Sequence, residues 1–240
     1  MADQLRFLTA EEELEVKEEK IVYHEIGHFV ISFLVRKLRL HEKHSLAVDY
    51  KNIFSLPTYI IINAGINITG KGAVGFNSYP PPNPTEFYSK YLEFAFCGAL
   101  IALAGHVFDF KFTQKEFDPS FFVFGKDWGE ENDKKQFDEF AKFFIPQKYR
   151  RKTQEYISKY DELVSKIKSL ILEITNFSSA KKMVHLIATT LINKVPDENG
   201  EKRLKGEELN QIFEIMNAEL KNIPMAQLIE NCMLEIDSEE

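Results

Sequence analysis

The chain has 240 residues, of which 44% are hydrophobic and 28% are charged, and this composition excludes wholesale disorder. Its 37 acidic and 30 basic residues give a net charge of -7, which argues against nucleic acid or an anionic membrane surface as the main partner. Cys97 and Cys232 form no CxxC pair, so neither a disulfide framework nor a cysteine zinc site is expected. A reducing, cytoplasmic location fits this cysteine usage best.

The N-terminal region contains no apolar run of the kind that a signal peptide needs. The longest apolar stretch, residues 92–105, is too short to span a bilayer comfortably and carries Glu93. We therefore expect this stretch to form a buried core helix, and we expect no membrane span.

The first predicted helix begins at a capping box formed by Thr9 and Glu12 and runs to about Leu38. The sequence pattern changes over residues 45–79, where short runs of β-forming residues are separated by Gly and Asn. This pattern predicts a small sheet. The β-rich runs are SLAVDY (45–50), PTYIIINA (57–64) and AVGFNSY (73–79).

Further helices are predicted beyond the prolines that end the sheet. They cover residues 86–105, the segment from Asp127 to before Pro146, a long amphipathic stretch that begins near Tyr156, and residues 179–194 and 206–220. A Phe-rich connection follows the first of these helices, to about residue 126. The predicted fold is therefore a single mainly α domain with a small β-sheet (α+β). Its parts are an active-site part (1–146), a C-terminal helical part (147–220) and a C-terminal tail (221–240) whose acidic end frays.

Residues 24–28, His-Glu-Ile-Gly-His, form a complete HExxH motif within the first predicted helix. Positions i and i+4 lie about 40° apart on a helix, one turn along, so His24 and His28 can bind one Zn²⁺. Glu25 is then placed to take a proton from zinc-bound water, whose pKa the metal lowers to about 7. The alternative is a charged surface helix with two chance histidines. However, apolar residues surround the helix, and buried histidines and a buried glutamate need a partner such as a metal.

A catalytic zinc needs a third protein ligand and one open position. Ile31 and Leu34 stand where the metzincin extension requires Gly and His, so that extension is excluded. Asp133 is the favoured ligand because it shares the apolar stripe of Phe137 on the helix predicted after Asp127, and a carboxylate on a buried face needs a partner. A salt bridge is the competing interpretation. Asp138, five residues further on, is expected to face water. Other ligand candidates are His41, His44, His106, His185 and Glu131. We interpret His41 and His44 as solvated surface residues, and His106 and His185 as structural histidines beside apolar segments.

Several segments together resemble the peptidase domain of the FtsH-type zinc metalloproteases. LTAEEELEVKEEKIVYHEIGHFVISFL (8–34) is similar to the start of that domain, whose helix reads like YHEAGHA. In the same order, GAVGFNSYPP (72–81) resembles the strand beside the family's active site, and FAFCGALIALAG (94–105) resembles its GGRAAEE helix. GEENDKKQF (129–137) resembles the GAxNDLxxAT segment, and RLKGEELNQIF (203–213) resembles the LDGEEL segment. The resemblance covers about residues 8–215.

The chain departs from the family at two places. Ala102 and Leu103 stand near the positions of the acidic pair in the GGRAAEE helix. The interval between His28 and Asp133 is longer than usual, and we interpret residues 107–126 as an insertion relative to the family. The ATPase module and membrane anchor that family members carry before this domain are not found in the sequence. We therefore expect either a partner ATPase acting in trans or substrates that are already unfolded.

The resemblance implies a zinc-dependent metalloendopeptidase, a hydrolase that cleaves unfolded polypeptides. His24, His28 and Asp133 would bind Zn²⁺, and Glu25 would be the general base. The resemblance also implies a hexameric ring, and a substrate that adds as an extended strand along Gly75, Phe76, Asn77 and Ser78. The alternative function is a non-proteolytic module that kept the fold to bind a partner or to assemble. The presence of Glu25 argues against it, since a scaffold has no need for a general base.

Overall fold

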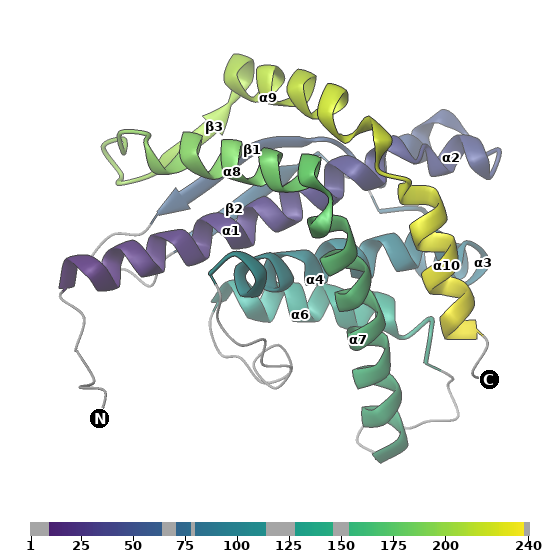
Figure 1. Ribbon diagram of the computed structural model, residues 1–240. Coiled ribbons are helices and arrows are strands. Elements are labelled where there is room, and N and C mark those ends of the chain that lie inside the picture. The colour runs from purple at the N-terminus through teal and green to yellow at the C-terminus, as the bar shows by residue number, and fades with distance from the viewer. Residues whose placement is uncertain (1–9, 64–70, 78–79, 114–127, 146–153, 238–240) are drawn as a thin grey trace.

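The computed structural model describes residues 10–63, 71–77, 80–113, 128–145 and 154–237 (Figure 1). These residues are mainly helical and carry one small antiparallel sheet, so the predicted α+β fold class is confirmed. The helices are α1 (Ala10–Lys37), α2 (Leu40–Lys43), α3 (Pro84–Lys90), α4 (Leu92–Thr113), α6 (Trp128–Ala141), α7 (Gln154–Asn176), α8 (Ser178–Ile192), α9 (Gly206–Glu219) and α10 (Met225–Asp237). The strands are β1 (Pro57–Asn63), β2 (Lys71–Phe76) and β3 (Lys202–Lys205).

The sheet has the strand order β2-β1-β3, and both strand pairs are antiparallel. Ile60 of β1 lies opposite Val74 on one side and Leu204 on the other, so one row of apolar side chains crosses all three strands. Ile60, Ile62 and Leu204 are buried, as the alternation of side chains along a strand requires for the face turned to the core. β2 is an edge strand of the described sheet.

Helix α1 lies at the centre of the molecule, with the sheet and α8 on one side and α4 on the other (Figure 1). Its side chains from Val22 to Val35 are largely buried. Helix α4 packs in turn against α6 and α7. The segment Leu92–Thr113 has the length and apolar composition of a membrane span, but 78% of its most apolar window is buried inside the protein. Its burial agrees with the predicted core helix.

Helices α1 and α4 approach each other unusually closely at Gly27, the glycine of the HExxH segment. A Cβ atom at this position would lie 2.5 Å from the carbonyl oxygen of Ala104 and 3.0 Å from the Cα of Gly105. Any larger residue would therefore meet the backbone of α4. Gly27 thus sets the distance between the two helices that frame the HExxH side chains.

The structure corrects several predicted elements. SLAVDY forms no strand, because residues Val48–Asn52 form a short 3-10 helix. None of its residues is buried, and Val48 is exposed to solvent. The helix predicted over 86–105 is two helices that break at Tyr91, and the second continues to Thr113, into the expected insertion. Residues 114–127 and Thr9 lie outside the described residues. The short charged strand β3 and the helix α10, which lies in the expected tail, were not predicted.

Candidate metal centre

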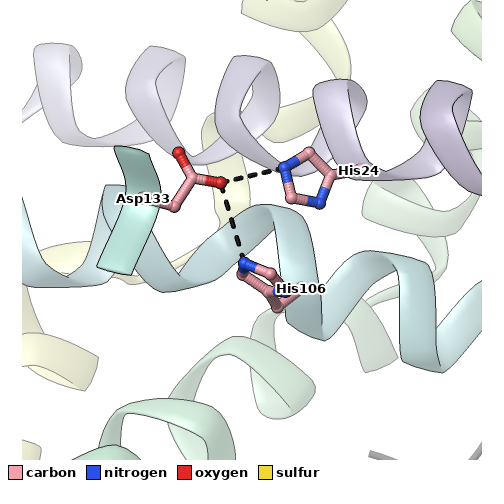
Figure 2. A group of neighbouring side chains, drawn as sticks. All are labelled: His24, His106 and Asp133. Atoms are coloured by element: carbon pink, nitrogen blue, oxygen red, sulfur yellow. Dashed lines mark hydrogen bonds and ion pairs between the residues drawn. The ribbon is translucent and has the colours of Figure 1, made fainter. Parts of the chain in front are cut away.

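Helix α1 presents His24 and His28 on one face, one turn apart, and their Nε2 atoms lie 3.2 Å from each other. Asp133 reaches the same point from α6, across 109 positions of sequence. Its Oδ2 atom lies 2.9 Å from Nε2 of His24 and 3.0 Å from Nε2 of His28. Figure 2 shows the Asp133 carboxylate directed at the His24 ring. The structure therefore brings together the three predicted metal ligands.

The spacing of these three atoms suits a metal ion. Zinc–ligand bonds of about 2.0–2.1 Å in a tetrahedron place neighbouring donor atoms about 3.3 Å apart. The three observed distances of 2.9, 3.0 and 3.2 Å are close to this edge length. Two imidazole nitrogens and one carboxylate oxygen are also donors that zinc accepts. The residues present therefore fit the metal that the sequence predicts.

The orientation of His28 is set by the backbone of α4. Its Nδ1 atom donates a hydrogen bond to the carbonyl oxygen of Ile101 at 2.8 Å. With the proton on Nδ1, a neutral ring would present the lone pair of Nε2 to a metal bound between His24 and Asp133. In metal-binding histidines generally, a hydrogen bond from the ring nitrogen that does not bind the metal fixes the tautomer and the orientation of the ring.

Gly105 of α4 leaves the space in which the donor atoms meet. A Cβ atom at this position would lie 2.5 Å from Nε2 of His28 and 2.8 Å from Nε2 of His24. A side chain at residue 105 would therefore occupy the region where the two imidazoles converge. The missing side chain at Gly105 is therefore a second observation, beside the donor distances, that supports the fit to a metal.

The charges of the cluster complement one another. Burial raises the pKa of Asp133, but His28 and the hydrogen bonds from His24 and His28 outweigh it and hold that pKa well below its usual range. Burial lowers the pKa of His28, yet the neighbouring Asp133 carboxylate raises it to about 9 overall. Without a metal, the same residues therefore form an imidazolium–carboxylate pair.

Glu25, the predicted general base, is buried beside the cluster, and burial raises its pKa, with the imidazoles of His24 and His28 opposing the shift. Its carboxylate lies against Gly72 at the start of β2, where a Cβ atom would come within 3.0 Å of Oε1. An alanine at residue 72 would therefore have to displace this carboxylate. The edge strand thus runs directly past Glu25.

His106 of α4 belongs to the same cluster, although the sequence pattern favoured a structural role for it. Its Nε2 atom lies 3.8 Å from Oδ2 of Asp133, and its ring stands edge-on to that of His24 (Figure 2). Donor atoms of His24, His106 and Asp133 all lie within 4.8 Å of one another. Burial, followed by the effect of His24, lowers the pKa of His106 well below its ordinary value. The sequence signal was a histidine directly after the apolar run 94–105, because a buried histidine needs a polar partner as much as the HExxH histidines do.

The remaining candidates whose side chains the structure describes are not part of this cluster. His44 contacts Glu93, with Nε2 3.1 Å from a carboxylate oxygen, and His185 is exposed on α8. The side chain of Glu131 lies outside the described residues. Asp138 does not simply face water as expected, because it is partly buried and accepts hydrogen bonds from the Tyr160 hydroxyl and Lys134. His41, 11% exposed in α2, also stands apart from the cluster.

The predicted substrate-binding segment follows the edge strand. Gly75 and Phe76 are the last residues of β2, Asn77 follows it exposed, and Ser78 lies outside the described residues. Phe76 also lines a largely apolar pocket of about 450 Å³. This pocket borders the cluster, since Ile101 lies in its wall and Ser32 and Gln136 follow His28 and Asp133 by about one helical turn.

A search of known family models finds none that matches the chain, and a search of curated proteins finds no similar one.

Proposed function

We propose that the protein is a zinc-dependent metallopeptidase of the FtsH peptidase type that hydrolyses peptide bonds in unfolded polypeptides. One observation carries this proposal: the Nε2 atoms of His24 and His28 and the Oδ2 atom of Asp133 meet within 3.2 Å, with Glu25 buried beside them. An ordinary structural ion pair needs neither the second histidine nor the glutamate. A hydrolytic metal site needs all four groups.

The roles of the residues follow from their positions. His24, His28 and Asp133 would hold the zinc, which when bound supplies a Lewis acid and an activated water. Glu25 would be the general base, taking a proton from the attacking water on its carboxylate and giving it to the nitrogen of the leaving amine. A buried carboxylate with a raised pKa suits both transfers, because it holds a proton near neutral pH more readily than an exposed one.

The edge strand β2 offers a place for the substrate backbone. An extended peptide that pairs with this edge forms main-chain hydrogen bonds that do not depend on its sequence. The same peptide would pass Gly72, against which the Glu25 carboxylate lies. The apolar pocket lined by Phe76, Tyr88 and Phe140 would accept a large apolar side chain of the substrate. We therefore expect a preference for unfolded chains rich in exposed apolar residues.

The same proposal includes an unfolding partner in trans and a ring-shaped assembly of the chain. The second candidate function is a non-proteolytic module that acts with a separate partner. The complementary charges of His28 and Asp133 favour this candidate, because they hold the cluster together without a metal. Light scattering at high micromolar concentration tests the assembly, and a monomer would contradict it.

Metal analysis and casein cleavage together test the function. The purified protein should contain one zinc per chain and cleave unfolded casein. Glu25→Gln should keep the zinc and lose about 100- to 10,000-fold in turnover, since it removes only the general base. Glu19→Gln, an exposed residue of the same helix, is the matched control and should stay active. Unchanged turnover in Glu25→Gln would exclude this mechanism, and a zinc-free, inactive protein would favour the non-proteolytic module.

A further inference from the structure

We infer that His106 is a fourth protein ligand of the same metal, so that the resting centre is a set of three histidines and one aspartate. This inference rests on the proposed metal centre and deepens it. It goes beyond the resemblance, which implies only His24, His28 and Asp133.

Two further imidazoles stand at the same distance from the His24 ring, and all three point at the Asp133 carboxylate. The ring centroids of His24 and His28 are 4.9 Å apart with an interplanar angle of 75°. Those of His24 and His106 are also 4.9 Å apart, with an interplanar angle of 87°. The Nε2 atoms of all three rings approach the same Oδ2 atom of Asp133. Three rings that present their nitrogen edges to one point form the donor arrangement of a metal site.

The backbone of α4 explains why His106 reaches this point. Within six residues, this helix supplies the Ile101 carbonyl that orients His28, the space at Gly105 and the His106 ring itself. The His106 side chain is only 8% exposed. A histidine placed merely to fill core space would not need to direct Nε2 at the carboxylate that two other histidines share.

The distances also rank the four donors. His106 Nε2 lies 3.8 Å from Asp133 Oδ2, about 0.5 Å more than the tetrahedral edge of about 3.3 Å. The distances among the donor atoms of His24, His28 and Asp133 are all shorter than that edge length. His106 would therefore be the weakest ligand of the four. Because zinc also accepts five ligands, His106 could be bound together with the water that the proposed function requires.

X-ray absorption of the zinc-loaded full chain counts the imidazoles bound to the metal. We expect three in the wild-type protein and two in His106→Ala, with an exposed-residue control, His185→Ala, retaining three. We also expect His106→Ala to bind zinc about 10- to 100-fold more weakly, the range found when groups that support a metal site are removed. The cobalt-substituted wild-type and His106→Ala proteins should differ in visible absorption, because the ligand field changes with the donor set.

The wild-type measurement needs no variant, so it remains decisive if His106→Ala fails to fold. Two imidazoles in the wild-type protein would overturn the inference, as would a chain that binds no metal. Casein cleavage with only two bound imidazoles would leave the proposed function standing while the inference fails. Three bound imidazoles without any casein cleavage would support the inference, while the proposed proteolytic function would fail.

Discussion

Helices α1 and α7 are both long and both pack into the core, but their buried faces differ in kind. The face of α7 is a regular apolar stripe that includes Leu163, Ile167, Ile171 and Ile174, with its charged side chains outside. The buried part of α1 includes the polar Glu25 and His28 among its apolar residues. An apolar stripe such as that of α7 requires only that neighbouring side chains fill the space beside it. A buried polar set instead needs particular atoms from other helices.

The largest effect should come from removing the atom that α6 supplies to α1. Asp133→Ala should lose the metal and all detectable hydrolysis, and it should lower the thermal midpoint because bound metal stabilises the folded state by mass action. Metal analysis and calorimetry of the loaded protein measure both effects. Glu139→Ala is the matched control, since Glu139 is 60% exposed on the same helix and surface ion pairs contribute about 0–1 kcal/mol. Full zinc content in Asp133→Ala would refute its assignment.

A substitution in the stripe of α7 should act on stability alone. Ile171 is fully buried, and Ile171→Ala should lower the free energy of unfolding by about 2–5 kcal/mol through lost burial and a residual cavity. Urea unfolding followed by circular dichroism gives this value. The folded fraction should still bind zinc as tightly as the wild-type protein. Ser165→Ala, at an exposed position of the same helix, should leave stability nearly unchanged. A loss of metal affinity in folded Ile171→Ala would show that the two helices are not independent.

The contact of Gly27 with α4 predicts that Gly27→Ala lowers stability, although a change from glycine to alanine within a helix normally raises it. Alanine normally stabilises a helix relative to glycine by about 0.8–1 kcal/mol. Here its Cβ would lie 2.5 Å from the Ala104 carbonyl oxygen, so α1 and α4 must separate. We expect Gly27→Ala to destabilise the protein by about 1–3 kcal/mol, the usual cost of overpacking, and to weaken metal binding. Increased stability in the same urea measurement would contradict the close crossing.

The smallest effect concerns the metal-free protein and its pH dependence. The pKa of His28 is raised from 6.5 to about 9 in the folded state. Stability from its pairing with Asp133 is therefore fully present below pH 6.5 and is lost as the pH rises towards 9. Thermal midpoints in a chelator should fall by a few degrees across this window. The zinc-loaded protein should instead gain stability there, because protons compete with the metal for the ligands. A flat profile without metal would contradict the imidazolium–carboxylate pair.

Most helices were predictable, because their signals are local. The helical spacing of apolar residues from Tyr156 to Ile174 indicated α7, which the structure places at Gln154–Asn176. The strand β3 was missed because Lys202–Lys205 has a charged sequence and becomes a strand only by pairing with β1. Helix α10 was missed because its acidic end suggested fraying, whereas Ile229 and Cys232 are buried, and α10 packs against α7.

For the candidate site, the sequence by itself determined the geometry of His24 and His28, because two residues four positions apart on one helix are brought together by the helix alone. It also pointed to Asp133, since a carboxylate among buried apolar residues needs a partner. Only the tertiary structure decided that Asp133 and His106 approach these histidines, that Gly105 leaves room for them, and that Glu25 lies against Gly72. These relations depend on how α1 crosses α4, α6 and the edge of the sheet. That crossing is set by backbone contacts such as Gly27 against Ala104, which no local periodicity encodes.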